Sequence, residues 1–218
     1  MTGARTAREP ERAVATILFT DITRSTERAA ELGDRRWRDL LERYDSVVRD
    51  QVRQFDGRVV KSLGDGALAV FDGPARAVAC AEEIRHELGG VGIRARCGIH
   101  TGECEMIGDD VGGMAVHITA RVMGFAKADE ILVSSTVADL VVGSNLAFEE
   151  RGRHTLKGVP GKWRLLAVDH ERRKTPRPTP ASRPREAVPP SNGSAGPLLR
   201  RASQAMRAAV KLDRRPTA

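Results

Sequence analysis

Hydrophobic positions along the chain recur with two periods, which predict strands alternating with helices. Residues 13–22 form an apolar run of strand length. The following segment, 24–55, spaces its apolar residues three and four positions apart and predicts a long amphipathic helix interrupted at Gly33. Residues 57–71 predict two strands joined by a Gly-Asp-Gly turn, a composition typical of a β-hairpin.

The second half of the chain continues this alternation. Pro74 stands at the start of a predicted helix, where its missing N–H group costs nothing. The first six elements follow the order β-α-β-β-α-β, which predicts an α+β fold with a ferredoxin-like antiparallel sheet, helices on one face, and an appended helix and strands. The last two of these six elements are the helix at 74–88 and the strand at 92–102. The appended elements are the helix at 113–126, the strand at 130–135, the short helix at 136–142, and strand segments at 146–152, 153–158 and 163–168.

Composition and charge divide the chain into a folded part and a basic tail. With 218 residues, 40% hydrophobic and 30% charged, the chain can bury one core, and a fully disordered protein is excluded. Residues 1–169 contain 24 Lys and Arg against 26 Asp and Glu, a net charge of −2, whereas residues 170–218 carry +9. The folded part therefore lacks the basic excess of a nucleic-acid-binding domain.

The same division predicts four segments. Residues 1–12 are expected to be a disordered N-terminus and 13–169 one folded domain. Residues 170–196, rich in proline and arginine, predict a disordered linker. Residues 197–215 place apolar residues at helical spacing between arginines, which predicts either a short basic amphipathic helix or a solvated tail. Such a tail could contact anionic membranes or nucleic acid weakly.

The sequence also indicates a cytoplasmic protein. No segment approaches the roughly 18 unbroken apolar residues of a transmembrane helix, so stable membrane insertion is not expected. The N-terminus has no apolar segment typical of a secretory signal. Three cysteines, an odd and sparse set, do not form a disulfide framework.

Two aspartates are candidate metal ligands. Asp21 ends the first predicted strand, and Asp65 lies in the turn just before the third. In the predicted topology these strands are antiparallel neighbours, so both carboxylates reach one edge of the sheet. Carboxylate and carbonyl oxygens are hard ligands suited to Mg²⁺ or Mn²⁺, and two adjacent ions suit phosphoryl chemistry. The simpler alternative is that Asp65 is only a turn residue and Asp21 only a helix cap.

The start of the long helix directly follows Asp21. Its free N–H groups and its positive dipole end could hold phosphate oxygens. Every helix has such an end, so this feature is not specific by itself. The residues concerned are Thr23, Arg24, Ser25 and Thr26.

Several motifs resemble, in order and spacing, one enzyme family. They are FTDITRST, VVKSLGDGALAVF, CGIHTGE, DDVGGMAVHITARVM, EILVSS and RHTLKGVPGKWRLLAV. Together they are similar to the class III nucleotidyl (adenylate/guanylate) cyclase catalytic domain, in its bacterial branch, over about residues 13–168. The resemblance implies the nucleotide cyclase fold and a head-to-tail homodimer with active sites at the interface.

The resemblance also implies an activity and a metal site. Asp21 and Asp65 match the metal-binding aspartates, and the backbone carbonyl of Ile22 would add a ligand. Two Mg²⁺ or Mn²⁺ ions per active site would assist attack of the ATP 3′-hydroxyl on the α-phosphate. The implied function is an adenylate cyclase that forms 3′,5′-cyclic AMP and pyrophosphate for signal transduction.

Four more residues match family positions that contact the nucleotide. Lys61 matches the lysine that reads the adenine ring, and Asp110, next to Asp109, matches its partner in base selection. This pair implies ATP as substrate. Arg121 matches the arginine that stabilises charge on the α-phosphate, and Lys157 matches the lysine that grips the terminal phosphates.

One position departs from the family pattern. His117 stands where the family usually has the asparagine that positions the ribose. Losing that positioning could cost about 10²-fold in rate. His117 could instead be a helix residue without any ligand contact. The alternative function is therefore a catalytically weak, cyclase-like nucleotide-binding module with a regulatory role.

Overall fold

The computed structural model describes residues 11–170. The predicted linker and helix in the basic tail, and most of the predicted disordered N-terminus, lie outside the described residues. The strands are β1 (Glu11–Ile22), β2 (Arg58–Ser62), β3 (Gly66–Phe71), β4 (Ala95–Ile107), β5 (Asp110–Gly112), β6 (Ile131–Ser134), β7 (Phe148–Thr155) and β8 (Lys162–Val168). The helices are α1 (Ser25–Gln54), α2 (Pro74–Gly90), α3 (Met114–Phe125) and α4 (Ser135–Leu140).

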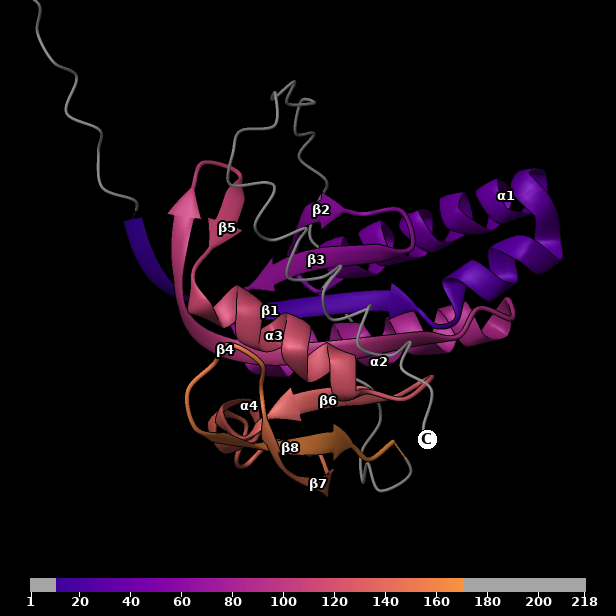
Figure 1. Cartoon of the computed structure of the whole chain (residues 1–218). Helices are drawn as coiled ribbons and strands as arrows, with labels where there is room; N and C mark the ends of the chain where they lie inside the picture. Colours follow the sequence, from indigo (N-terminus) through magenta and orange to yellow (C-terminus); the bar gives the residue numbers. More distant parts are fainter. Residues whose placement is uncertain (1–10, 171–218) are drawn as a thin grey trace, which may run out of the picture.

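One mixed sheet organises these elements (Figure 1). Its order is β2-β3-β1-β4-β6-β8-β7, and β5 pairs with β4 beside this path. Neighbouring strands run antiparallel except β4 and β6, which are parallel. The four strands around β1, with α1 and α2, form the predicted ferredoxin-like unit, and the later elements extend it.

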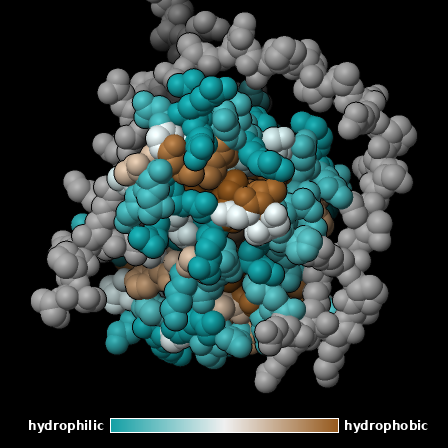
Figure 2. Space-filling view, turned by 90° about the vertical axis from the view of Figure 1, so that its right-hand side faces the viewer, coloured by the Kyte–Doolittle hydropathy of each residue, from teal (hydrophilic) through white to brown (hydrophobic). Residues whose placement is uncertain are grey.

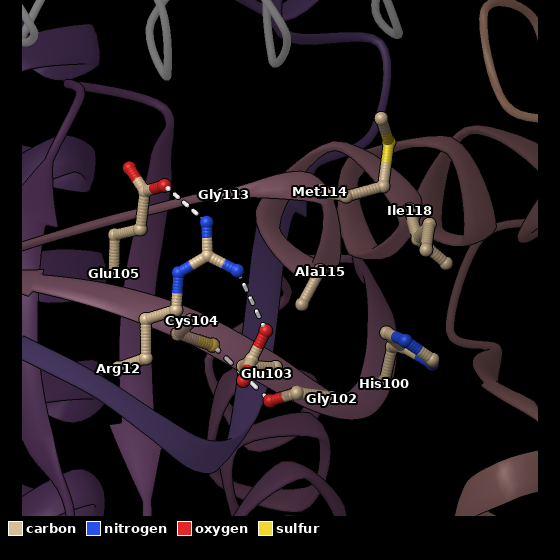
Figure 3. Close-up of a pocket in the computed structure, with 10 residues that line it drawn as sticks. All are labelled: Arg12, His100, Gly102, Glu103, Cys104, Glu105, Gly113, Met114, Ala115 and Ile118. Atoms are coloured by element: carbon tan, nitrogen blue, oxygen red, sulfur yellow. Dashed lines mark hydrogen bonds and ion pairs between the residues drawn. The ribbon is translucent and has the colours of Figure 1, made fainter.

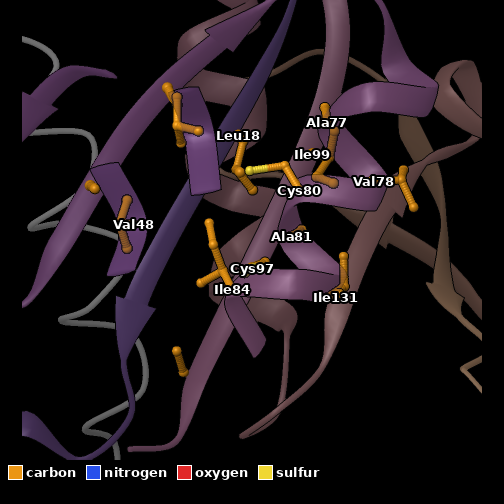
Figure 4. Close-up of a cluster of buried hydrophobic side chains, with 14 of the residues drawn as sticks. Leu18, Val48, Ala77, Val78, Cys80, Ala81, Ile84, Cys97, Ile99 and Ile131 are labelled. Carbon is orange, nitrogen blue, oxygen red and sulfur yellow. The ribbon is translucent and has the colours of Figure 1, made fainter. Parts of the chain in front are cut away.

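One face of the sheet is covered by α1, α2 and α4, which bury a single apolar cluster (Figure 4). Tyr44, Val48 and Val52 supply the buried stripe of α1. Aromatic residues are scarce in this chain, so aliphatic side chains, alanines and cysteines fill most of the cluster. Burial of this apolar surface is the main source of stability for this layer.

The appended helix α3 covers the opposite face, so the expectation of helices on one face holds only for the ferredoxin-like unit (Figure 1). Small residues allow the close approach of α3 to β4. A methyl group added at Gly98 would overlap the backbone nitrogen of Met123. At this point the helix therefore rests on the strand backbone rather than on a side chain.

Four local features differ from the sequence-based expectation. Strand β1 begins at Glu11 rather than at residue 13, because its first residues pair with the far end of β4. Strand β4 runs on to Ile107 for the same reason. The short β5 was expected to be a loop. The two strand segments expected over 146–158 are one strand, β7, with a bulge in which Gly152 has a positive φ of 82°.

The long helix α1 is interrupted where the sequence predicts it. Gly33 has φ 73° and ψ 166°, which no residue inside a helix adopts, so α1 consists of two segments joined at this glycine. All the buried residues of α1 lie in the second segment. Over residues 11–170, no helix is both long and apolar enough to span a membrane.

The contact between Gly98 and α3 yields a stability prediction. Gly98→Ala should lower the free energy of unfolding by about 1–3 kcal/mol, because the added methyl group meets backbone that cannot rotate away. The matched control is Gly89→Ala in α2, where no atom lies within 4 Å of the added methyl group. That variant should be neutral or stabilised by up to about 1 kcal/mol. Urea unfolding followed by circular dichroism measures both, and equal stabilities of the two variants would contradict the packing argument.

Candidate functional site

The first strand brings Asp21 and Asp65 together. In the β1–β3 ladder Asp21 lies opposite Gly66, the residue after Asp65. The backbone N–H of Ile22 donates a hydrogen bond to the carbonyl oxygen of Asp65, with the two atoms 2.8 Å apart. The two aspartates expected at one edge of the sheet are thus adjacent there, and they provide hard oxygen donors from neighbouring strands.

Asp21 is a buried carboxylate paired with an arginine. Its side chain is 2% exposed, and its Oδ2 accepts bonds from Nη2 of Arg96 at 3.0 Å and from Nε at 3.3 Å. The helix-cap alternative for Asp21 is wrong. The N-cap position of α1 is occupied by Arg24, in a left-handed conformation, and no side chain caps it. Asp65 does lie in the β2–β3 turn, as the simpler interpretation had it.

Lys61 and Asp110 form an ion pair. Nζ of Lys61 lies 2.9 Å from Oδ1 of Asp110, with the lysine buried and the aspartate half-buried. The same Oδ1 accepts a hydrogen bond from the backbone N–H of Val111 at 2.8 Å. The Lys61 ion pair is with Asp110, whereas the neighbouring Asp109 accepts a hydrogen bond from Arg58 through its backbone carbonyl. The expected pair is therefore joined through Asp110.

The two cations expected at the phosphates are also neighbours. Nε of Arg121, on α3, donates to the backbone carbonyl of Lys157 at 3.2 Å. Nη1 of Arg121 is buried and has no hydrogen-bond partner among the described residues. The side chain of Lys157 is exposed on the loop between β7 and β8. This contact brings the backbone of Lys157 next to Arg121, although the two residues are 36 positions apart in sequence.

His117 and the start of α1 complete the expected set. His117 is half-buried on α3, one turn before Arg121. At the helix start, the hydroxyl of Thr23 donates to the carbonyl of Arg94 at 3.0 Å, so this side chain already has a structural partner. Arg24 and Thr26 are exposed and Ser25 is half-buried.

Most of these side chains share one face of the sheet. Directly paired residues on neighbouring antiparallel strands point to the same side. Asp21 is two residues after Phe19 on β1, so the two side chains point to the same side. Asp21 is opposite Arg96, and Lys61 is opposite Leu68. Phe19 and Leu68 belong to the cluster beneath α3. The Asp21 carboxylate, the Lys61–Asp110 pair and the α3 residues therefore lie on the face opposite α1 and α2, and Asp65 lies in the turn at the edge of the sheet next to Asp21.

A cavity of about 320 Å³ lies elsewhere, between the distal half of β4 and the beginning of α3 (Figure 3). Arg12 spans its rim and forms ion pairs with Glu103 and Glu105. Within residues 11–170, its lining includes none of the residues expected at the site. This cavity is therefore distinct from the candidate site.

His100 lines that cavity and has a structural role. Its Nδ1 lies 2.7 Å from the Ser134 hydroxyl, and its ring packs edge-on against Trp163. Burial lowers the pKa of His100 to about 4, because the charged imidazolium would lose its hydration. The ring is therefore neutral near pH 7.

Another group of possible metal ligands lies on the surface of α2. Glu83, His86 and Glu87 place ligand atoms within 4.8 Å of one another. These residues follow one another along a helix and are mostly exposed. Such acidic groups are common without an ion, so the Asp21–Asp65 pair remains the better candidate.

Sequence reasoning missed Arg96. The signal was available, because a strand antiparallel to β1 must place some residue opposite Asp21. The prediction began that strand at residue 92 without fixing its register, and only the observed pairing identifies Arg96 as the neighbour.

Comparisons with known proteins agree with this geometry. Residues 8–169 match the family model described as the adenylate and guanylate cyclase catalytic domain. An uncharacterised protein of Mycobacterium tuberculosis is 27% identical over 174 residues, which cover 77% of this chain. The chain spans only about 60% of the length of that relative.

Solved structures of both nucleotide specificities share the fold. The adenylyl cyclase CyaB from P. aeruginosa is similar with a TM-score of 0.71 and 23% identity, covering 78% of this chain and all of that one. The guanylyl cyclase Cya2 is similar with a TM-score of 0.64 and 24% identity, covering 74% of this chain and 94% of that one. At these identities the likeness establishes the fold and leaves the base specificity open.

The environment of His100 predicts a dependence of stability on pH. The unfolded chain protonates this imidazole near pH 6.5, whereas the folded chain keeps it neutral down to about pH 4. The unfolded state therefore binds more protons between these values, and stability falls as the pH drops through that window, by up to about 3 kcal/mol.

Urea unfolding from pH 7 to pH 4 tests this prediction. His100→Gln keeps a hydrogen-bonding group but cannot titrate, so the fall should be shallower than in the wild type. His86→Gln, which changes an exposed histidine of α2, is the matched control and should retain the wild-type slope. If the free energy of unfolding changed with pH equally in all three proteins, His100 would not be the cause of the fall in stability.

Proposed function

Because this chain belongs to the adenylate and guanylate cyclase catalytic domain family, we propose that it converts ATP to 3′,5′-cyclic AMP and pyrophosphate. The observation that carries the choice of ATP is the contact between Lys61 and Asp110, with Nζ and Oδ1 2.9 Å apart. A lysine donor beside an aspartate acceptor matches adenine, which offers a ring nitrogen as acceptor and an exocyclic amine as donor.

The ion pair can bind a base without being broken. The ammonium group of Lys61 has three N–H donors, and it forms an ion pair with Asp110 but no hydrogen bond within the described residues. The carboxylate of Asp110 has a second oxygen that the Lys61 contact does not use. Lys61 can therefore donate a hydrogen bond to adenine, and Asp110 can accept one from it, while the ion pair between the two residues holds both side chains in place.

Arg121 and Lys157 are proposed to bind the phosphates. Nη1 of Arg121 is a buried donor without a hydrogen-bond partner among the described residues, so it is available to an α-phosphate oxygen. The exposed Lys157 side chain can reach the terminal phosphates. The backbone N–H groups at the start of α1, over Thr23–Thr26, can add donors. These groups stabilise charge as the 3′-hydroxyl attacks in line and pyrophosphate leaves.

The donor set at the β1–β3 edge fits Mg²⁺ or Mn²⁺. Two carboxylates and a backbone carbonyl, from Asp21, Asp65 and Ile22, are hard oxygen ligands, and Asp21 is already held in a fixed, buried position. We propose that these residues hold two ions per active site. When bound, the ions lower the pKa of the attacking hydroxyl and neutralise charge on the triphosphate.

A homodimer is proposed to complete the site. Two side chains of α3, Met114 and Phe125, are 51% and 45% exposed although they are large and apolar. Figure 2, which views the right-hand side of Figure 1, shows further apolar residues surrounded by hydrophilic ones at that end of the molecule. Uncovered apolar surface of this kind supports a protein partner, here a second copy. We place the reaction in the cytoplasm, since the three cysteines are free and buried.

His117 favours a second candidate function. If its imidazole fails to position the ribose, the domain would bind nucleotide but turn over slowly, and would act as a regulatory module. The half-buried place of His117 on the same helix as Arg121 is compatible with either outcome. The rate of cyclic nucleotide formation distinguishes an active cyclase from a regulatory module.

Product formation from ATP and GTP tests the proposal. Full-length protein with Mn²⁺ or Mg²⁺ should form cyclic AMP in preference to cyclic GMP. Asp65→Ala should reduce the rate at least about 10²-fold, because it removes a proposed metal ligand. Asp72→Ala, an exposed carboxylate at the other end of β3, is the matched control and should retain wild-type activity.

Absence of product separates the two candidate functions. A folded, dimeric protein that binds ATP but forms no cyclic nucleotide would favour the regulatory module. In that case His117→Asn should restore turnover if the ribose contact alone is missing. Equal activity of Asp65→Ala and wild type would reject the proposed metal site.

Base selection is tested by exchanging the ion pair. Lys61→Glu combined with Asp110→Cys replaces the proposed donor to the adenine ring and the proposed acceptor of its amine, and should lower the ATP-to-GTP ratio of kcat/KM by at least about tenfold. Arg58→Gln is the control, because it removes a neighbouring contact between β2 and the loop before β5. An unchanged ratio in a double variant with a wild-type circular dichroism spectrum would reject the assignment of these residues to the base.

A further inference from the structure

Arg96 is buried against the first carboxylate of the proposed metal site. Strands β1 and β4 pair so that Arg96 lies directly opposite Asp21, although the two are 75 residues apart in sequence. The arginine is 4% exposed, and two of its nitrogens contact the same carboxylate oxygen. The pair is therefore fixed by the sheet and shielded from water.

Such a pair is not explained by stability alone. Removing two charges from water carries a desolvation cost that their attraction often fails to repay, and apolar residues of similar size would pack as well. A buried ion pair next to a functional carboxylate therefore calls for another role. Asp21 with Asp65 carries two negative charges, and Arg96 reduces the net charge of this group to −1.

We propose that Arg96 is a built-in counter-ion of Asp21 that holds this carboxylate in place without metal and weakens the binding of a free divalent cation. This inference rests on the proposed function, since it takes Asp21 and Asp65 as the metal ligands. A nucleoside triphosphate supplies the negative charge that the site lacks, so cation and nucleotide bind favourably together.

We expect Arg96 to weaken cation binding because its positive charge lies close to a cation bound by Asp21. An ion coordinated by Asp21 must lie within a few ångströms of a guanidinium that is itself 3.0 Å from that carboxylate. Repulsion over such a distance is strong where water is excluded. The hydrogen bonds from Arg96 also fix the orientation of the carboxylate, which would otherwise be buried without a counter-charge.

Mn²⁺ binding in the absence of nucleotide tests the proposal. Electron paramagnetic resonance measures the free Mn²⁺ remaining in a titration of full-length protein. Arg96→Gln removes the charge and keeps a hydrogen-bond donor, and we expect it to bind Mn²⁺ at least about tenfold more tightly than the wild type. Adding Asp65→Asn to this variant should abolish the gain.

Arg94 provides the matched control. It lies just before β4, is exposed, and forms its ion pair with Asp129 rather than with Asp21. Arg94→Gln changes the net charge by the same amount and should leave the Mn²⁺ affinity within about twofold of wild type. An equal gain in both variants would mean that overall charge, and not the Arg96–Asp21 contact, sets the affinity, which overturns the proposal.

Thermal unfolding provides a second readout. Without metal, Arg96→Gln should unfold at a lower temperature than the wild type, and Mn²⁺ should raise its Tm by more than it raises that of the wild type. If Arg96→Gln is unfolded in EDTA, millimolar Mn²⁺ should restore the fold, because the ion replaces the lost counter-charge. A variant that stays unfolded with Mn²⁺ contradicts the proposal.

The outcomes separate this proposal from the proposed function. Cyclic AMP formation that depends on Asp65, together with an unchanged Mn²⁺ affinity in Arg96→Gln, rejects the role of Arg96 and leaves the cyclase intact. No cyclic nucleotide, and no Mn²⁺ binding that responds to Asp65→Asn in any background, rejects the metal site and with it both proposals.

Discussion

The pairing of β1 on both sides is the constraint on which the candidate site depends. A single register sets Gly66 and Arg96 opposite Asp21, on β3 and β4 respectively. A slip of one residue would turn Asp21 toward the apolar cluster under α1 and α2, where a carboxylate has no counter-charge. The burial of Leu18 and Ile22 on that side and of Phe19 on the other holds the register. Packing of the core thereby determines the electrostatics of the site.

The two faces of the sheet have different tasks. The face beneath α1, α2 and α4 buries the larger apolar cluster and supplies stability. Within residues 11–170, α3 and the loop before β8 pack on the opposite face, where Asp21, Lys61 and Arg96 also lie. Lys61 and Arg96 are buried on this face beside carboxylates rather than among aliphatic side chains alone. A stable layer thus supports a layer whose charged groups are available for binding.

Much of this organisation could be predicted from the sequence, and the reasons for success and failure differ. The adjacency of Asp21 and Asp65 followed from element order, because antiparallel neighbours must bring those strand ends together. Strand β5 is too short to have a hydrophobic period, and Gly152 looked like the end of a strand although it sits in a bulge. The partners Lys61 and Asp110 came from family resemblance, since spacing gives no reason for their contact. Identifying Arg96 as the neighbour of Asp21 required the register of the β1–β4 pairing, which hydrophobic periodicity does not give.

The interruption of α1 at Gly33 has a mechanical consequence. The segment before the glycine starts next to Asp21, and none of its side chains is buried, whereas Tyr44, Val48 and Val52 anchor the segment that follows. The first segment is instead held by the loop before β4, where Thr23 donates to the carbonyl of Arg94 and Arg28 donates to the carbonyl of Gly92. The start of α1 therefore takes its position from the edge of the sheet beside Asp21, and not from the apolar stripe of its own second segment.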